Sequence, residues 1–595
     1  MKNIVFAIFA GILVFVLNSC TSEKPPHEKI YADFNADLDS LIVMNDGFLE
    51  KIRSKPGVKT LQEDFLKLRL QFKKTEAFAE YFFPTTVRMI NGAPLDEIED
   101  EENAVFEPGG LQVIEELIYT DEPVNQEELV RHARKMQVNV KRIKMLWVDI
   151  RITDSHVMDA LRLEMFRLIS LGISGFDTPA SGNALAESAV VLKSFQHYTQ
   201  AYKDQLPEFA KLDGLTRAAI AFLGQNRDFN AFDRSIFIAD YVNPLCRSLH
   251  KNQELAAIPF MNGRKLLNGN VATIFDKNAF NPEALLPDSK FNATADRVAL
   301  GRTLFYDSRI SGNGKTNCGS CHQPGKAYAD GLKTSKGFDN KFVDRNAPSI
   351  MYASLQQALF YDLRAPSLED QAADVIHNKL EMHGSMDDVA KLVATDESYK
   401  RDFKKAYPEL DSISPVYIQN ALASFVRSLN PFNSPFDKYM RGDKKVLTDD
   451  QVKGFNVFMG KAKCGTCHFV PLFNGTVPPD FQRTESEVLG VTVHADWKNP
   501  VLDKDPGRGV HDQFPQWKNA FKTSSVRNIA KTAPYMHNGA FATMQEVMEF
   551  YNEGGGAGLG LDVPNQTLAA EKLNLTAIEI TQVISFMEAL TDAPE

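Results

Sequence analysis

Apolar side chains recur at helical spacing through most of the first half of the chain. One group stands at positions i, i+4, i+7 and i+11, on a single face of a helix: Leu61, Phe65, Leu68 and Phe72. Residues 157–171 and 184–202 carry the same kind of pattern. Because this period continues with only short interruptions, we expect residues 30–255 to form a helical domain.

Short runs of helix-breaking or charged residues separate these periodic stretches. Residues 172–179 contain two glycines and a proline, which predicts a loop. A second group of breakers, residues 108–110, comes directly before the apolar stretch 111–118. Residues 96–102 include six acidic side chains in seven positions, which predicts a solvated loop.

A helix near the C-terminus has clear start and stop signals. Thr543 is followed three residues later by Glu546, the pattern of a capping box, and the glycines at 554–556 end the helix. Its apolar stripe has the spacing i, i+3, i+4, i+7 and consists of Met544, Val547, Met548 and Tyr551. The pattern therefore predicts that Tyr551 faces the protein interior.

Length and charge narrow the class of protein. A chain of 595 residues is too long for a single core, so we expect two to four domains. The net charge of −11 and a pI near 5.7 argue against nucleic-acid binding and leave a basic redox partner open. Cys246 is an isolated thiol, which we interpret as a buried small apolar residue.

The first residues indicate export. Lys2 precedes the apolar segment 4–17, which is too short to span a bilayer comfortably. The segment ends at Leu17-Asn18-Ser19-Cys20, which resembles a bacterial lipobox. We expect residues 1–19 to be a lipoprotein signal peptide, Cys20 to carry the lipid, and residues 20–29 to be a tether in an exported protein that faces the periplasm. An ordinary secretory signal is the alternative.

Two Cys-x-x-Cys-His pentads, residues 318–322 and 464–468, carry the strongest chemical signal. Each is the attachment pattern of a c-type haem, in which two thiols bond the vinyl groups and the histidine ligates the iron. A redox CxxC needs no histidine, and zinc-site pairs usually lie closer together. The sequence therefore predicts two covalently bound haem c groups, held by Cys318, Cys321, His322, Cys464, Cys467 and His468.

The spacing of the pentads predicts the remaining domains. His468 follows His322 by 146 residues, which is enough chain for a domain. We expect a mainly α protein: the N-terminal helical bundle, an irregular linker over residues 256–290, and two cytochrome c-like haem domains over residues 291–445 and 446–595.

The segments around the pentads closely resemble the bacterial dihaem cytochrome c peroxidase and MauG family. The similarity runs from about residue 299 to the C-terminus. It rests on blocks in a fixed order: LGRTLFYD at 300–307, RNAP at 345–348, SLEDQA at 367–372, Glu381-Met382, DPGR at 505–508, VRN at 526–528 and PYMHNG at 534–539.

This resemblance implies that the first haem is the peroxide-reactive one. Its acid–base group would be Glu381, assisted by Gln371, because peroxide cleavage needs a proton moved between the two oxygens. Many family members block this haem with a histidine, and Phe338 stands at the matching position. Phenylalanine cannot ligate iron, so the resemblance predicts an open site unless His377 or His383 supplies a ligand.

At the second haem the resemblance implies a distal ligand on the helix that carries Tyr551. The peroxidases place methionine at that position and MauG-like members place tyrosine, with Met548 as the competing ligand here. Tyr361 takes the place of the family's tryptophan between the haems. The family also binds calcium between its halves, and the matching residues are Asn346, Thr532 and Pro534.

Residues 110–115 loosely resemble the G-x-H-x-x-E motif of imelysin-like helical domains. Gln112 stands where that family has histidine, and an amide is a poor metal ligand. The alternative is a helical bundle that docks on the catalytic part without binding a metal.

Together these patterns predict a lipid-anchored dihaem peroxidase of the MauG-like branch. It would reduce hydrogen peroxide with electrons from a small cytochrome c, a quinol or a protein side chain. A MauG-like oxidase that modifies a protein substrate and a non-catalytic dihaem electron carrier are the alternatives.

Overall fold

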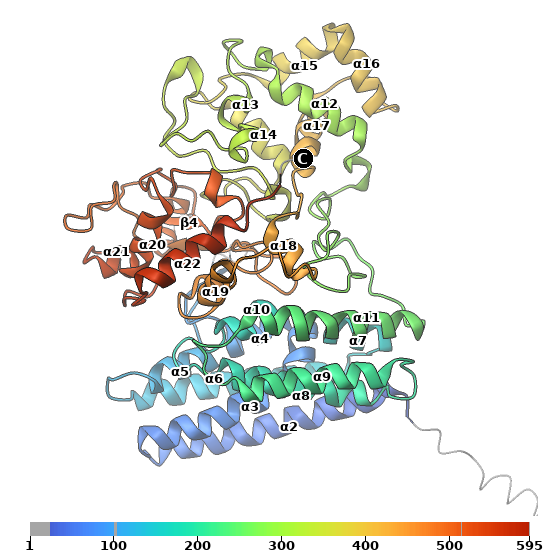
Figure 1. The fold of residues 1–595 in the computed structure, drawn as a ribbon, viewed down its shortest axis with the longest axis vertical. Coiled ribbons are helices and arrows are strands. Elements are labelled where there is room, and N and C mark those ends of the chain that lie inside the picture. Colours follow the sequence, from blue (N-terminus) through green and yellow to red (C-terminus); the bar gives the residue numbers. More distant parts are fainter. Residues whose placement is uncertain (1–23, 100–103, 513, 594–595) are drawn as a thin grey trace, which may run out of the picture.

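The computed structural model describes residues 24–99, 104–512 and 514–593. The expected signal peptide, residues 1–19, and the lipobox Cys20 lie outside the described residues. Helices dominate the fold and the two small sheets have two strands each, so the prediction of a mainly α protein is confirmed (Figure 1).

The N-terminal part is a stack of long helices, drawn at the bottom of Figure 1. Its elements are α2 (Pro26–Arg53), α3 (Val58–Phe82), α4 (Pro84–Asn91), β1 (Glu97–Glu99), β2 (Ala104–Phe106), α5 (Leu111–Ile118), α6 (Gln126–Trp147), α7 (Asp154–Ser170), α8 (Ala184–Gln200), α9 (Phe209–Gln225), α10 (Arg234–Ile236), a π-helical turn (Phe237–Val242) and α11 (Asn243–Leu255).

The predicted helical face in this region is confirmed. The four apolar residues of α3, spaced at i, i+4, i+7 and i+11, are all fully buried: Leu61, Phe65, Leu68 and Phe72. Thr153 caps the start of α7, since its hydroxyl accepts from the backbone N–H of His156. Local period and capping therefore determine these helices, because both act within one or two turns.

The acidic run was predicted to be a solvated loop, and this was wrong for its first part. Glu97–Glu99 forms a strand that pairs antiparallel with Ala104–Phe106, with Ile98 opposite Val105. Residues 100–102 lie outside the described part of the chain. Pairing with the strand Ala104–Phe106, whose residues are apolar, therefore forms despite the acidic residues of Glu97–Glu99.

Both haem-motif regions use the same helix crossing. The first contains α12 (Ala295–Tyr306), α13 (Cys318–Cys321), α14 (Leu368–His377), α15 (Met386–Thr395), α16 (Glu397–Ala406) and α17 (Pro415–Arg427). After α18 (Pro435–Met440), the second contains α19 (Asp449–Met459), β3 (Ser486–Val488), β4 (Ala520–Lys522), α20 (Met544–Asn552), α21 (Gly555–Gly558) and α22 (Ala577–Glu588).

A glycine sits where the first and last helices of each region cross. A Cβ on Gly301 of α12 would lie 1.8 Å from the carbonyl oxygen of Ala421 on α17, and a Cβ on Gly454 of α19 would lie 1.9 Å from that of Gln582 on α22. Only glycine permits such close backbone approach. The two regions are thus built on one plan, and each holds its pentad just after its first helix.

The buried apolar core is divided unequally among these parts. One cluster covers the N-terminal helices and continues into the second haem region through side chains such as Phe436, Phe458 and Phe586. The first haem region has a separate cluster that includes Leu304, Phe403 and Phe425. The N-terminal helices are therefore packed onto the second haem region as one body.

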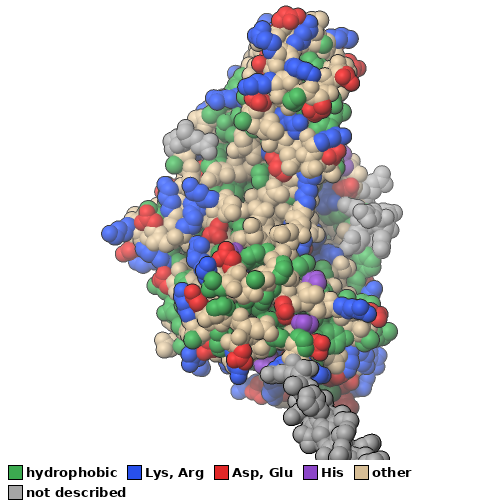
Figure 2. Space-filling view, turned by 90° about the vertical axis from the view of Figure 1, so that its right-hand side faces the viewer, with side chains coloured by type: hydrophobic (Ala, Val, Ile, Leu, Met, Phe, Trp, Pro, Cys, Tyr) green, Lys and Arg blue, Asp and Glu red, His purple; other side chains and the backbone are tan. Residues whose placement is uncertain are grey.

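The face shown in Figure 2 carries charged side chains of both signs and apolar ones, which are most numerous in its lower half. Among the described helices, none is both long enough and apolar enough to cross a membrane.

Candidate haem sites and active site

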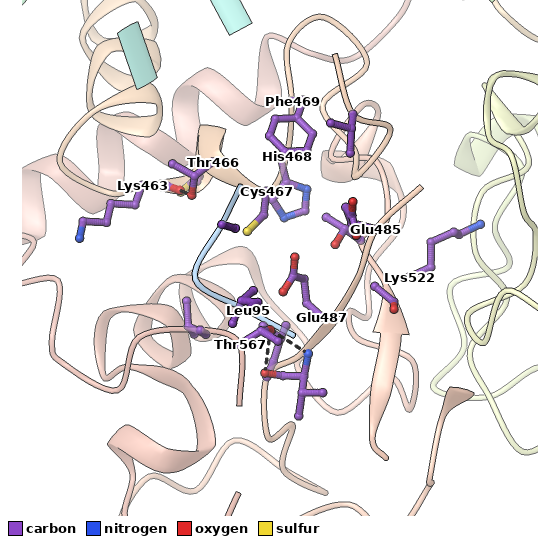
Figure 3. Close-up of a pocket in the computed structure, with 18 of the residues that line it drawn as sticks. Leu95, Lys463, Thr466, Cys467, His468, Phe469, Glu485, Glu487, Lys522 and Thr567 are labelled. Atoms are coloured by element: carbon purple, nitrogen blue, oxygen red, sulfur yellow. Dashed lines mark hydrogen bonds between the residues drawn. The ribbon is translucent and has the colours of Figure 1, made fainter. Parts of the chain in front are cut away.

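The second pentad presents a neutral imidazole to a large cavity. The Nδ1 of His468 lies 3.1 Å from the carbonyl oxygen of Ser524. A carbonyl can only accept, so Nδ1 carries the proton and Nε2 keeps its lone pair. Burial lowers the pKa of His468 to about 4, which keeps the ring neutral. In Figure 3 this ring and the Cys467 sulfur face the same space.

That cavity has a volume of about 2030 Å³. Cys464, Cys467 and His468 line one part of it, and the inward stripe of α20 lines another, with Met544, Val547, Met548 and Tyr551. The predicted capping box of α20 is present at Thr543 and Glu546. Burial, with the two thiols and Glu487 nearby, raises the pKa of Tyr551 well above its usual value.

The first pentad repeats the arrangement of the second. Its first four residues form the short helix α13, and the Nδ1 of His322 donates to the carbonyl oxygen of Tyr328 at 2.9 Å. Burial lowers the pKa of His322. Each pentad therefore combines two thiols with a neutral imidazole whose Nε2 is available to a metal, which is the donor set that a c-type haem requires.

Glu381 lies near the first pentad in a turn that follows α14. Its carboxyl is close enough to raise the pKa of the Cys318 and Cys321 thiols, although burial contributes most to both shifts. Burial raises the pKa of Glu381 itself to about 7, against the opposing influence of Arg364 and of a hydrogen bond. A carboxyl with this pKa can both accept and donate a proton near neutral pH.

Asn378 makes that hydrogen bond, and the sequence analysis did not single it out. Its Nδ2 donates to Oε1 of Glu381 at 2.8 Å, while its Oδ1 accepts from the backbone N–H of Leu380 at 2.9 Å. The second bond fixes the amide, so its N–H₂ group faces the carboxylate. The three-residue spacing was visible in the sequence, but the burial of the pair was not.

Gln371 occupies a different position from Glu381. It lies on α14 and lines the large cavity together with Phe360 and Tyr361. The structure gives no hydrogen bond between the described side chains of Gln371 and Glu381. The assisting role of Gln371 therefore stays a prediction.

Phe338 lies beside the turn that carries Glu381. Its backbone N–H donates to the carbonyl oxygen of Leu380 at 2.9 Å, and its ring packs against that of His383 with centroids 4.7 Å apart. The Nε2 of His377 accepts from the backbone N–H of Met386 at the start of α15. Ligation of iron through Nε2 of His377 would require this bond to break.

Tyr361 and Asn346 lie where the two haem regions meet. The backbone N–H of Asn346 donates to the carbonyl oxygen of His537, and that of Lys522 donates to the carbonyl oxygen of Tyr361, both at 2.7 Å. The Tyr361 hydroxyl donates to Oδ1 of Asn346 at 3.4 Å, and Arg345 pairs with both Asp362 and Asp505. The residues expected to bind calcium lie on the wall of the large cavity: Asn346, Thr532 and Pro534. Calcium binding stays a prediction.

Glu487 is a further cavity residue that the sequence did not reveal. It lies on β3, and Figure 3 shows its carboxyl pointing into the pocket near Cys467. Burial raises its pKa to about 7. No motif marks it, since its position depends on the pairing of β3 with β4.

In residues 110–115, which loosely resemble the imelysin motif, Gln112 and Glu115 form hydrogen bonds with other residues of the N-terminal part. The Nε2 of Gln112 donates to the carbonyl oxygen of Asn91 at 2.9 Å. Oε1 of Glu115 accepts from the backbone N–H groups of Ala180 and Ser181, and Arg69 lies 3.6 Å from its other oxygen. Both side chains thus support local structure.

The fold and the two pentads define a mainly α protein with two c-type haem sites. Residues 295–445 match the family model described as di-haem cytochrome c peroxidase. A cytochrome-c peroxidase, IdrP1, of Pseudomonas sp. (strain SCT) is 31% identical over 363 residues, which cover 56% of this chain and 94% of the relative. The chain belongs to the di-haem cytochrome c peroxidase and MauG family.

Two further similarities each cover about half of this chain. The methylamine utilization protein MauG of Methylorubrum extorquens is 30% identical over 319 residues, covering 53% of this chain and 85% of that protein. The crystal structure of a MauG-like protein associated with microbial copper homeostasis has a TM-score of 0.44 and 29% identity, covering 51% of this chain and 92% of that one.

Proposed function

We propose that this protein reduces hydrogen peroxide at the first haem site with electrons that arrive through the second. The observation that carries the proposal is Glu381, a half-buried carboxyl beside the first pentad with a pKa of about 7 and an orienting hydrogen bond from Asn378. An electron carrier has no use for such a group, because its haems exchange electrons without moving a proton between substrate oxygens.

The residues of the first site have two roles, haem binding and proton transfer. His322, Cys318 and Cys321 would hold the haem, which supplies the iron that binds and reduces peroxide. Glu381 takes the proton from one peroxide oxygen and returns it to the other, which leaves as water; such proton transfer contributes about 10²–10⁴ in rate. Gln371 is proposed to assist it.

The second site would hold its haem through Cys464, Cys467 and His468. We infer that Tyr551 would also ligate this haem, because it lies on α20 and lines the same cavity as His468. A phenolate is a harder, anionic ligand than the Met548 thioether and favours ferric iron. This supports the MauG-like branch, and a MauG-like oxidation of a protein side chain is the second candidate function.

Three further features belong to this proposal. We infer export and a lipid on Cys20 from the lipobox, and a calcium ion at Asn346, Thr532 and Pro534 from the family pattern. Elemental analysis of the purified protein checks the calcium. The N-terminal helices carry the imelysin-like motif, for which we infer a structural role.

Steady-state peroxide consumption by Glu381→Gln tests the proposal. We expect a loss of about 10²–10⁴ in turnover, with haem content and visible spectrum unchanged, because only the proton transfer is removed. Glu397→Gln is the matched control, since that side chain is 78% exposed on α16. Wild-type turnover in Glu381→Gln, or reduced wild-type protein that peroxide does not oxidise, would refute the proposal.

A further inference from the structure

The N-terminal part of the chain contacts the two residues that flank the second pentad. The ring of Phe176, in the loop between α7 and α8, packs edge-on against Phe469 with centroids 5.8 Å apart. Phe469 is the residue after His468. On the same side, Nζ of Lys463 donates to the carbonyl oxygen of Pro179 at 3.4 Å. Residues 172–179 therefore cover the segment to which the second haem would be attached.

A buried arginine joins this loop to the haem region. Arg234, fully buried, donates through Nε to the carbonyl oxygen of Ile173 at 2.9 Å. Its guanidinium also lies against Gly460, where an added Cβ would be 2.6 Å from Nη1. Gly460 comes four residues before Cys464. The loop and the pentad are thus held by one side chain.

Asn456 fixes the same junction from the other side. Its Oδ1 accepts from the backbone N–H of Ser235, and its Nδ2 donates to Asp233, both at 3.0 Å. These bonds join residues more than 220 positions apart in the chain. Together with the shared apolar core, they make the contact part of the folded structure.

A second N-terminal segment reaches another wall of the cavity. Residues 92–96 connect α4 to β1, and Figure 3 shows Leu95 pointing into the pocket that Glu487 and Thr567 also line. The next residue, Asp96, accepts from Nε2 of Gln516 at 2.9 Å. Leu95 is 42% exposed, so it lies at the mouth of the cavity.

The cavity is larger than one ligand requires. Its volume of about 2030 Å³ is roughly twice the upper end of the usual range for ligand pockets, about 1,000 Å³. A haem held at His468 would therefore not fill the cavity, and we call the part lined by Leu95, Glu487 and Thr567 the branch. Apolar Leu95 and Phe176 and polar Lys463 and Gln112 line the cavity. Such a lining suits a small organic molecule.

We propose that the N-terminal helices form a wall of the second haem site, which shields the attached haem from water and leaves the branch beside Leu95 as the entry for a small organic reductant. This rests on the proposed function, in which electrons enter through the second haem. Because the loop 172–179 contacts the residues on both sides of the pentad, a protein donor is kept away from that side.

Redox titration of Phe176→Ala tests the shielding. Water that enters beside Phe469 favours the more highly charged ferric haem, so the potential of the second haem should fall while that of the first stays unchanged. Phe342→Ala, at a ring 60% exposed in the first haem region, is the matched control. Phe176→Leu should restore most of the potential. An unchanged potential of the second haem, or an equal shift in the potentials of both haems, would refute the proposal that the N-terminal helices shield the second haem.

Stopped-flow reduction of the oxidised protein tests the entry. Hydroquinone should reduce wild type faster than an equal concentration of reduced monohaem cytochrome c. Leu95→Trp, which fills the mouth, should slow hydroquinone while reduction by dithionite is unchanged. Equal reduction rates with hydroquinone and cytochrome c, or no effect of Leu95→Trp on reduction by hydroquinone, would refute the proposal that a small organic reductant enters beside Leu95. Peroxide consumption measured alongside separates this failure from failure of the proposed function.

Discussion

Replacing Asn378 by aspartate isolates the hydrogen bond that orients the Glu381 carboxylate. The aspartate keeps an oxygen for the backbone N–H of Leu380 but removes the Nδ2 donor that now lies 2.8 Å from Oε1 of Glu381. It also places a second negative charge beside the carboxylate. Both changes disfavour the ionised form of Glu381 and raise its pKa.

The size of the shift follows from the bond that is lost. A hydrogen bond to a charged group is worth about 1.5–3 kcal/mol, and a pKa unit corresponds to about 1.4 kcal/mol, so we expect a rise of about 1–2 units. With a pKa of about 7 in wild type, about a tenth of Glu381 is ionised at pH 6. The variant would have about a hundredth to a thousandth ionised at that pH.

The assay is the pH dependence of kcat/KM for peroxide. Because Glu381 acts first as a base, the acidic limb should move to higher pH, with activity about 10- to 100-fold lower at pH 6 and mostly recovered above the new pKa. Asn281→Asp is the control, since the Oδ1 of Asn281 accepts from the backbone N–H of Glu283 in a similar turn outside the haem regions. An acidic limb that does not move, or an equal loss at every pH, would refute the reasoning.

Three further predictions concern the ligands and the anchor. Tyr551→Phe should change the visible and EPR spectrum of the second haem while Met548→Leu leaves it nearly unchanged; the reverse result would assign Met548 as the ligand. The oxidised protein should show a high-spin first haem by EPR, and Phe338→His should convert it to low spin, so a purely low-spin wild-type spectrum would contradict an open site. Cys20→Ala should move the protein from the membrane fraction to the soluble fraction, and wild type found only in the soluble fraction would exclude the lipid.

Local patterns predicted the parts of this protein whose physics is local. The period of α3 placed Leu61 and Phe72 in the core, and the Thr543–Glu546 pair marked the start of α20. Both depend on contacts within a few residues. The prediction of a loop over the acidic run was wrong for Glu97–Glu99, because these residues pair with a second strand and the number of charges in a segment does not reveal such a partner.

The site shows the same division. Asn378 is only three residues from Glu381 in the sequence. The raised pKa of Glu381, however, results from the water that the fold removes around its carboxyl, which the sequence does not reveal. Glu487 reaches the large cavity because β3 pairs with β4, a strand more than thirty residues further along the chain. Neither property can be read from residue types, since each depends on how much water the fold removes.

By itself the sequence determined that this protein carries two c-type haem sites in a mainly helical fold. Both features depend on residues close together in the chain, since the haem attachment motif spans five residues and the helix period is visible within a few turns. Only the tertiary structure decided that the two sites have different surroundings. Long-range packing brings Phe176, Leu95 and Arg234 of the N-terminal helices to the second pentad and leaves the first with Glu381 and Asn378. Burial and the dielectric at the second site follow from contacts that join residues more than 200 positions apart.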